Sequence, residues 1–304
     1  MTPLRIRSIT EFHRYNELPQ PEHPLISVVD FALISAAKKH HPVRTIVGDY
    51  YTISVKRGLG GKMRYGQQEY DFDEGIMYFM APGQLLQTSP PPEPGVEPSG
   101  WILLIHPDFL WGTSLAKTIK HYEFFEYSVS EALFLSDKEE ATLNNIIANI
   151  KQEYHSNIDK FSQNIIISQI ETLLNYSERF YQRQFITRKI TNHKVIDRME
   201  QILSDYFNNE SMVVNGLPTV QYVADLLNIS PKYLSSLLKV LTGQTAQQHI
   251  HEKLIEIAKE KLSTTDLTAS EIAYALGFEH PQSFSKLFKL KTNLSPLEFR
   301  GTFN

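Results

Sequence analysis

The chain has 304 residues, no cysteine, and 30 Lys/Arg against 34 Asp/Glu, which gives a net charge of −4. This length favours two domains, and the lack of cysteine excludes disulfides and thiolate chemistry. No apolar run reaches the roughly 18 residues of a membrane span, and the polar first 17 residues are not typical of a secretory signal. We therefore expect a cytoplasmic protein with no membrane partner.

Short alternating or apolar segments, broken by turn signals, run from Ile26 to about Tyr127. In one of them Tyr51, Ile53 and Val55 alternate with polar residues, which predicts a half-buried strand. The segment 89–100, SPPPEPGVEPSG, is expected to be a surface loop. Several short strands at spacings of about ten residues predict a β-sandwich or barrel.

Two helices are predicted to follow. Ser136 and Glu139 form a capping-box pattern at the start of the first helix, and the second runs from about 160 to 184. The second helix has more apolar residues than one face requires. The surplus either covers the strands in a monomer or pairs with a second copy of the chain. Residues 186–193, ITRKITNH, are polar and unperiodic, as in an interdomain linker.

The C-terminal part of the chain contains a repeat, with copies at 219–245 and 268–295. Ala224 matches Ala273 at a spacing of 49, and Lys239 matches Lys289 at 50 after one insertion in the turn. A repeat that keeps its apolar positions and its turn indicates a repeated structural unit. Each copy predicts two helices joined by a turn, a unit that can place its second helix in a DNA groove.

The second copy shows the local signals clearly. Thr268 and Glu271 predict a capping box, Gly277 a left-handed helix end, and His280 a cap before Pro281 at the first helical position. Phe284, Leu287 and Phe288 are the expected core there, and Leu234, Leu237, Leu238 and Leu241 in the first copy. The side chains predicted to face DNA are Lys232, Ser235, Ser236 and Lys239, and then Gln282, Ser283, Ser285, Lys286 and Lys289.

A helical stripe over 245–262 connects the copies. Its 18 residues would span about 27 Å at 1.5 Å per residue, close to the roughly 34 Å between successive major grooves. The charge of this region is balanced, with 12 Lys/Arg and 12 Asp/Glu from 189 to 304. We expect Lys286, Lys289, Lys291 and Arg300 to form a local basic cluster and DNA affinity to be modest and salt-dependent.

Residues 195–302 closely resemble the DNA-binding domain of AraC-type transcription regulators. The matching elements include Gly277-Phe278, Phe284-Ser285-Lys286 and Ser295-Pro296. The family often has Arg where Lys286 and Ser236 stand, usually Arg where Lys253 stands, and usually Gly where Asn293 stands. Serine cannot make a bidentate contact to guanine, so the resemblance implies a sequence reader in the second copy and a weaker clamp in the first.

The region ahead of this domain resembles the cupin-like sensor that such regulators often carry, on the pattern 70–75 followed by Ala81-Pro82-Gly83. The expected fold is α+β: a cupin-like β-barrel with two flanking helices, then an all-α domain with two helix-turn-helix motifs. The expected domains are 1–185 for sensing and dimerisation, 186–193 as linker, and 194–304 for DNA binding. Its many aromatic residues are interpreted either as core or as the lining of a ligand site, and no ligand residue is identified.

Catalysis is not expected, because the metal-binding spacing of catalytic cupins is absent. His40 and His41 are adjacent, and His249 and His251 diverge on a predicted helix. Phosphate-binding loops and hydrolase motifs are also absent from the sequence. We therefore expect no catalytic residue, no metal and no cofactor.

The expected function is sequence-specific transcription regulation, controlled by a small molecule bound in the N-terminal barrel. Expected partners are double-stranded promoter DNA, a second copy of the chain, a small-molecule effector and RNA polymerase. One alternative is a ligand-binding or enzymatic cupin whose helical domain contacts proteins. Another is an architectural protein that binds DNA without sequence preference.

Overall fold

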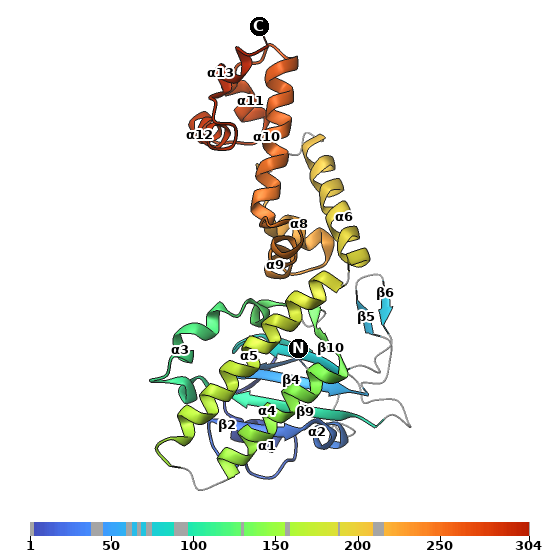
Figure 1. The fold of residues 1–304 in the computed structure, drawn as a ribbon, viewed down its shortest axis with the longest axis vertical. Helices are drawn as coiled ribbons and strands as arrows, with labels where there is room; N and C mark the ends of the chain where they lie inside the picture. Colours follow the sequence, from blue (N-terminus) through green and yellow to red (C-terminus); the bar gives the residue numbers. More distant parts are fainter. Residues whose placement is uncertain are drawn as a thin grey trace. The chain divides into compact units, whose positions relative to one another are not determined.

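The computed structural model describes residues 3–37, 45–58, 63–65, 68–70, 75–87, 97–128, 131–155, 159–187, 189–208 and 216–303. The chain divides into two units, Met1–Gln184 and Phe185–Asn304. The first combines sheets with helices, and the second is helical (Figure 1).

In the described residues of the first unit, the strands form two larger sheets and one two-stranded pair. A five-stranded antiparallel sheet has the order β10-β7-β4-β9-β2, a three-stranded sheet has the order β1-β3-β8, and β5 pairs with β6. The strands are β1 Leu4–Ile6, β2 Ile26–Asp30, β3 Thr45–Gly48, β4 Tyr51–Arg57, β5 Met63–Tyr65, β6 Gln68–Tyr70, β7 Gly75–Met80, β8 Leu85–Gln87, β9 Ser99–Ile105 and β10 Leu133–Leu135. Among the described strands no sheet closes on itself, so the predicted cupin-like barrel is not shown.

The large sheet is covered on both faces, which corrects the half-buried strand predicted at β4. Ile53, Ser54 and Val55 are all buried. Ser54 pairs with Ile102 of β9, on the face that packs against residues of β1 and α1. The opposite face lies under helices: Trp101 Nε1 donates to Asn144 Oδ1 at 2.8 Å, and Ser177 Oγ lies 3.8 Å from Met77 Sδ.

Helices α4 Asp137–His155 and α5 Ser162–Thr187 cross this covered face (Figure 1). The predicted capping box is confirmed, since Ser136 N–H donates to Glu139 Oε2 at 2.9 Å and Glu139 N–H donates to Ser136 Oγ at 3.4 Å. The remaining helical elements are α1 Ile9–Tyr15, α2 Phe31–Ala37, η2 Pro107–Leu110, α3 Leu115–Thr118, η3 Ile119–His121 and η4 Glu123–Glu126.

Most of the apolar surplus of α5 is used inside the protein. Its buried apolar residues are Ile166, Ile167, Ile170, Leu173, Leu174, Phe180, Tyr181 and Phe185. Among the described apolar side chains, Ile165 and Ile186 of the helix are strongly exposed, as is Phe161 just before it. The helix therefore offers a second copy of the chain less apolar surface than its composition suggested.

The second unit consists of helices. They are α6 Lys189–Asn208, α8 Val220–Leu227, α9 Pro231–Thr242, α10 Ala246–Thr264, α11 Ala269–Ala275, α12 Pro281–Thr292 and α13 Pro296–Arg300. Within the segment 186–193, residues 186–187 end α5 and residues 189–193 begin α6. In the described part of the chain, no helix combines the length and apolarity needed to cross a membrane.

Candidate nucleic-acid interface

Two helix-turn-helix motifs stand where the repeat predicts them, α8 with α9 and α11 with α12. The first helix of each motif begins at a threonine: Thr219 accepts a hydrogen bond from Tyr222 N–H, and Thr268 forms the predicted capping box with Glu271. The turns use the left-handed conformation at equivalent positions, Asn228 with φ 57° and Gly277 with φ 82°. The shared backbone path explains why the copies keep one pattern of apolar residues.

The second helices begin differently. Ser230 accepts a hydrogen bond from Tyr233 N–H, and Pro231 occupies the first turn of α9. Pro281 takes the same place in α12, but the side chain of His280 makes no capping hydrogen bond. The prediction of a histidine cap is therefore wrong. His280 supplies only the extended backbone that precedes the helix.

The repeat extends further than the matched apolar positions indicate. Helices α9 and α12 both end in a left-handed residue, Gly243 and Asn293. The hydroxyls of Thr242 and Thr292 each donate to a carbonyl four residues earlier, at 2.8 Å in both copies. Capping boxes then begin the next helices, at Thr245 with Gln248 and at Ser295 with Glu298. The spacing of fifty residues between Thr242 and Thr292 is the sequence signal that predicts this longer repeat.

Most of the residues predicted to form the core beneath α9 and α12 are buried. Leu234, Leu237, Leu238, Phe284 and Phe288 are buried. Leu241 and Leu287 are half-buried, less than expected. In the second motif Phe278, Phe284, Phe288 and Phe299 form a chain of ring contacts, with centroids 5.5 to 5.7 Å apart. This aromatic core connects α12 with the turn that follows α11 and with α13.

The outer faces of α9 and α12 are not equivalent. On α12 Gln282, Ser283, Lys286 and Lys289 are exposed and Ser285 is half-buried. On α9 only Lys239 of the predicted set is exposed, whereas Lys232, Ser235 and Ser236 are half-buried. Lys232 and Ser236 also interact with other groups of the protein. The second motif thus presents the larger accessible set of hydrogen-bonding side chains.

The basic cluster predicted around α12 is smaller than expected. Arg300 Nε donates to the carbonyl of Leu262 at 3.1 Å, and its Nη2 donates to the carbonyl of Leu267 at 2.6 Å. Lys291 Nζ lies 3.7 Å from a carboxylate oxygen of Glu252. Two of the four cations therefore bind to groups within the protein. The spacing of charges in the sequence does not reveal these contacts. Lys286 and Lys289 are exposed on α12.

The described residues contain no group of three or more His, Cys, Asp or Glu side chains that could hold a metal ion. His249 Nε2 lies 2.9 Å from the hydroxyl of Thr242, and His251 Nε2 lies 2.8 Å from the amide nitrogen of Gln247. These two histidines therefore take part in polar contacts within the second unit. His40 and His41 lie outside the described residues.

Known proteins share this region. The helix-turn-helix domain family matches residues 223–302. The chain is 34% identical over 116 residues to an HTH-type transcriptional regulator in the cgkA 5′ region of Pseudoalteromonas carrageenovora, covering 38% of this chain and 64% of that protein. It is 36% identical over 78 residues to the HTH-type transcriptional activator RhaS of an Enterobacter species, covering 26% and 28%.

A solved structure is also similar to part of the chain. The C-terminal domain of AraT, a response regulator from Geobacillus stearothermophilus, has 30% identity, covers 36% of this chain and 84% of that domain, and gives a TM-score of 0.31. The chain spans less than two thirds of the length of the curated relatives named above. With the repeated helix pairs in place, the family match and the sequence identities show that residues 223–302 form a helix-turn-helix domain of the AraC-type (AraC/XylS) family of transcription regulators.

Proposed function

We propose that the second unit binds double-stranded promoter DNA and that α12 reads its sequence. The observation that carries this proposal is the exposed stripe of Gln282, Lys286 and Lys289 on α12. These residues are spaced by four and three positions, so they lie on one helix face. Glutamine can bond bidentately to adenine and lysine to guanine O6 and N7, the contacts that discriminate bases in a major groove.

The first motif acts as a weaker clamp. Ser235 and Ser236 are short and half-buried, so Lys239 is the exposed contact that α9 offers to a phosphate. Helix α10 has 19 residues, a length of about 28 Å at 1.5 Å per residue. A connection of this length suits two helices that enter successive major grooves, which are about 34 Å apart.

Because few cations of the second unit are available to phosphates, we expect each chain alone to bind DNA with modest affinity. Phosphate neutralisation supplies much of the affinity of DNA-binding proteins, whereas residues 189–304 hold 12 basic and 12 acidic side chains. Binding by two chains at adjacent sites would compensate through effective concentration. We therefore propose a homodimer on DNA.

The first unit is proposed as a cupin-like sensor that responds to a small-molecule effector. Its two sheets around an apolar cluster and the sequence pattern at 70–75 and 81–83 support this role. We also propose contact with RNA polymerase, a cytoplasmic location and the absence of catalysis. Each of these three proposals follows from the family resemblance.

Selection from a random DNA pool tests the proposed function. The full chain should enrich a common sequence with two half-sites about one helical turn apart. An enriched pool without any shared sequence would indicate an architectural DNA-binding protein. Recovery of no DNA above a bead-only control would contradict DNA binding altogether.

A further inference from the structure

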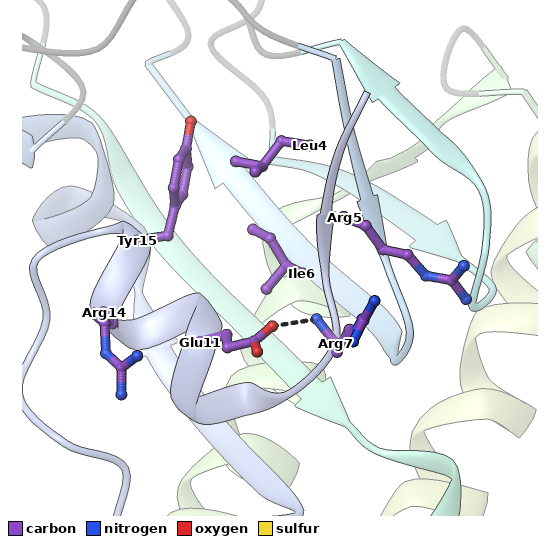
Figure 2. Close-up of a pocket in the computed structure, with 7 residues that line it drawn as sticks. All are labelled: Leu4, Arg5, Ile6, Arg7, Glu11, Arg14 and Tyr15. Carbon is purple, nitrogen blue, oxygen red and sulfur yellow. Dashed lines mark hydrogen bonds between the residues drawn. The ribbon is translucent and has the colours of Figure 1, made fainter. Parts of the chain in front are cut away.

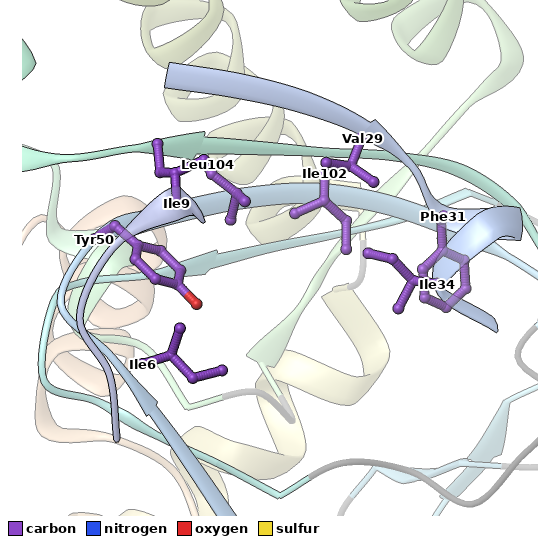
Figure 3. Packing of buried hydrophobic residues seen from close by; sticks show 8 residues of the cluster. All are labelled: Ile6, Ile9, Val29, Phe31, Ile34, Tyr50, Ile102 and Leu104. Atoms are coloured by element: carbon purple, nitrogen blue, oxygen red, sulfur yellow. The ribbon is translucent and has the colours of Figure 1, made fainter. Parts of the chain in front are cut away.

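The space between the two sheets of the first unit is filled by side chains. Ile6 and Ile9 pack with side chains of the large sheet, which are Val29, Ile102 and Leu104 (Figure 3). All five side chains are buried. Tyr50 belongs to the same cluster, and burial raises the pKa of its phenol far above the ordinary value. A ligand cannot enter this cluster without displacing buried core residues.

A cleft lies at the rim of this cluster, where β1 runs beside α1. Its volume is about 410 Å³, within the range of small-molecule sites. Leu4 and Ile6 project from β1 toward the side on which Tyr15 stands, and they form an apolar wall (Figure 2). Three arginines, Arg5, Arg7 and Arg14, complete the lining together with Glu11.

The three arginines differ in whether the protein already supplies a partner for the guanidinium group. Arg5 Nε lies 3.1 Å from both carboxylate oxygens of Asp49, so its charge is largely matched. Arg7 and Arg14 are exposed, and within the described part of the chain neither guanidinium is held by an ion pair or a hydrogen bond. In Figure 2 they lie on either side of Glu11. The cleft therefore carries two guanidinium groups that can be offered to a ligand.

Glu11 offsets one of these charges, but its position is explained by the backbone. Its Oε2 accepts a hydrogen bond from the Arg7 N–H at 2.6 Å, and its own N–H donates to Ser8 Oγ at 3.1 Å. These bonds fix the junction of β1 and α1 and hold the carboxylate beside the backbone. One net positive charge remains from Arg7, Arg14 and Glu11.

We infer that this cleft binds a small organic anion, with an oxyanion held by Arg7 and Arg14 and an apolar part against Leu4, Ile6 and Tyr15. Guanidinium groups recognise carboxylates and phosphates through paired, charge-assisted hydrogen bonds. The inference rests on the proposed sensor role of the first unit for its biological purpose. It places the effector at the rim of the apolar cluster and assigns the effector a negative charge.

The test compares two probes that differ in charge and have similar shape, 1-naphthoate and 1-naphthamide. Binding of each to the full chain is measured without DNA by ligand-detected NMR and by calorimetry. Wild type should bind naphthoate about tenfold more tightly than naphthamide, as expected for a charge-assisted pair. Arg7→Gln and Arg14→Gln should each reduce this ratio toward one. Arg179→Gln, which removes an exposed arginine from α5 of the same unit, should keep it.

Inorganic phosphate serves as a third probe. Competition of phosphate with naphthoate in wild type, lost in Arg14→Gln, would support an oxyanion subsite. Equal binding of naphthoate and naphthamide by wild type would overturn the inference, as would ratios in both arginine variants that match wild type. Because DNA is absent, a failure here leaves the proposed DNA-binding function standing, and a failure to select DNA leaves this site standing.

Discussion

Gly277 is pressed against Gly216. A Cβ atom on Gly277 would lie 2.9 Å from the carbonyl carbon of Gly216 and 3.1 Å from its Cα. The turn of the second helix-turn-helix thus touches the segment that leads into the first. Asn228 occupies the equivalent turn position in the first copy, also in the left-handed conformation. Backbone conformation alone permits asparagine there, so the close approach to Gly216 is the reason that the second copy has glycine.

Gly277→Asn should therefore destabilise the second unit by about 1–3 kcal/mol, because the new side chain must displace backbone. Gly243→Asn is the matched control, since its φ of 77° is similar and nothing lies within 4 Å of a Cβ there. Hydrogen exchange of α11 and α12 in the full chain measures the difference. Equal protection in the two variants would show that the contact with Gly216 has no energetic role.

Arg300 is predicted to stabilise the fold rather than bind DNA, because it bonds to the carbonyls of Leu262 and Leu267. Arg300→Lys should lose the paired donors and cost about 1 kcal/mol of stability. The salt dependence of DNA binding should stay unchanged. In Lys289→Ala the opposite is expected, with stability kept and the salt slope reduced by about one. A reduced slope in Arg300→Lys would place this arginine on a phosphate.

Acid should weaken the two capping boxes that contain glutamate. Hydrogen bonds from the backbone N–H of Thr268 and Ser295, and then from their hydroxyls, lower the pKa of Glu271 and Glu298 below 4.5. A folded pKa below the unfolded value adds stability above pH 4.5, and this stability is lost as the pH falls through the folded pKa.

The test is the double variant Glu271→Gln with Glu298→Gln, which copies the capping box of α10, where Gln248 does not titrate. Protection of α11 and α13 against hydrogen exchange should fall less in this variant than in wild type between about pH 6 and about pH 3. Parallel losses in the two proteins would mean that other carboxylates control the acid response.

Arg57 should be important for the stability of the first unit. Its Nε lies 2.9 Å and 3.1 Å from the two carboxylate oxygens of Glu140, whose side chain is 11% exposed. Arg57→Ala leaves this carboxylate buried without its partner, at a cost of about 2–3 kcal/mol once partial solvent exposure is allowed for. Asp137→Ala, which removes the 98% exposed second partner, should cost less than about 0.5 kcal/mol. Urea unfolding followed by the fluorescence of Trp101 and Trp111 measures both.

Local signals in the sequence were enough to predict the two helix-turn-helix motifs of the second unit. Prolines at the first helical position, threonine caps and left-handed turn residues act within a few residues of chain, so Pro231, Thr268 and Gly277 were assigned correctly. The roles of Arg300 and Lys291 were missed because their partners lie 33 to 39 residues away. Such contacts depend on how the helices pack, which the spacing of charges does not encode.

The first unit was harder to predict for the same physical reason. Alternation at β4 indicated one buried face, but Ser54 is buried too because the second sheet and α1 cover that side. Whether strands close into a barrel depends on pairings between distant segments, such as β1 with β3. The cleft lined by Arg7 and Arg14 depends on such a pairing and on the start of α1, so no sequence motif could identify it.

The most direct test of the central claim is the effect of Lys286→Ala on binding to a duplex selected from the random pool. Lys239→Ala on α9 and Lys138→Ala on the exposed start of α4 serve as matched charge controls. Lys286→Ala should reduce discrimination between the selected and a scrambled duplex about tenfold, the value of one good base contact. Lys239→Ala should weaken both duplexes equally, and Lys138→Ala should change neither. Wild-type discrimination in Lys286→Ala would contradict the assignment of α12 as the sequence reader.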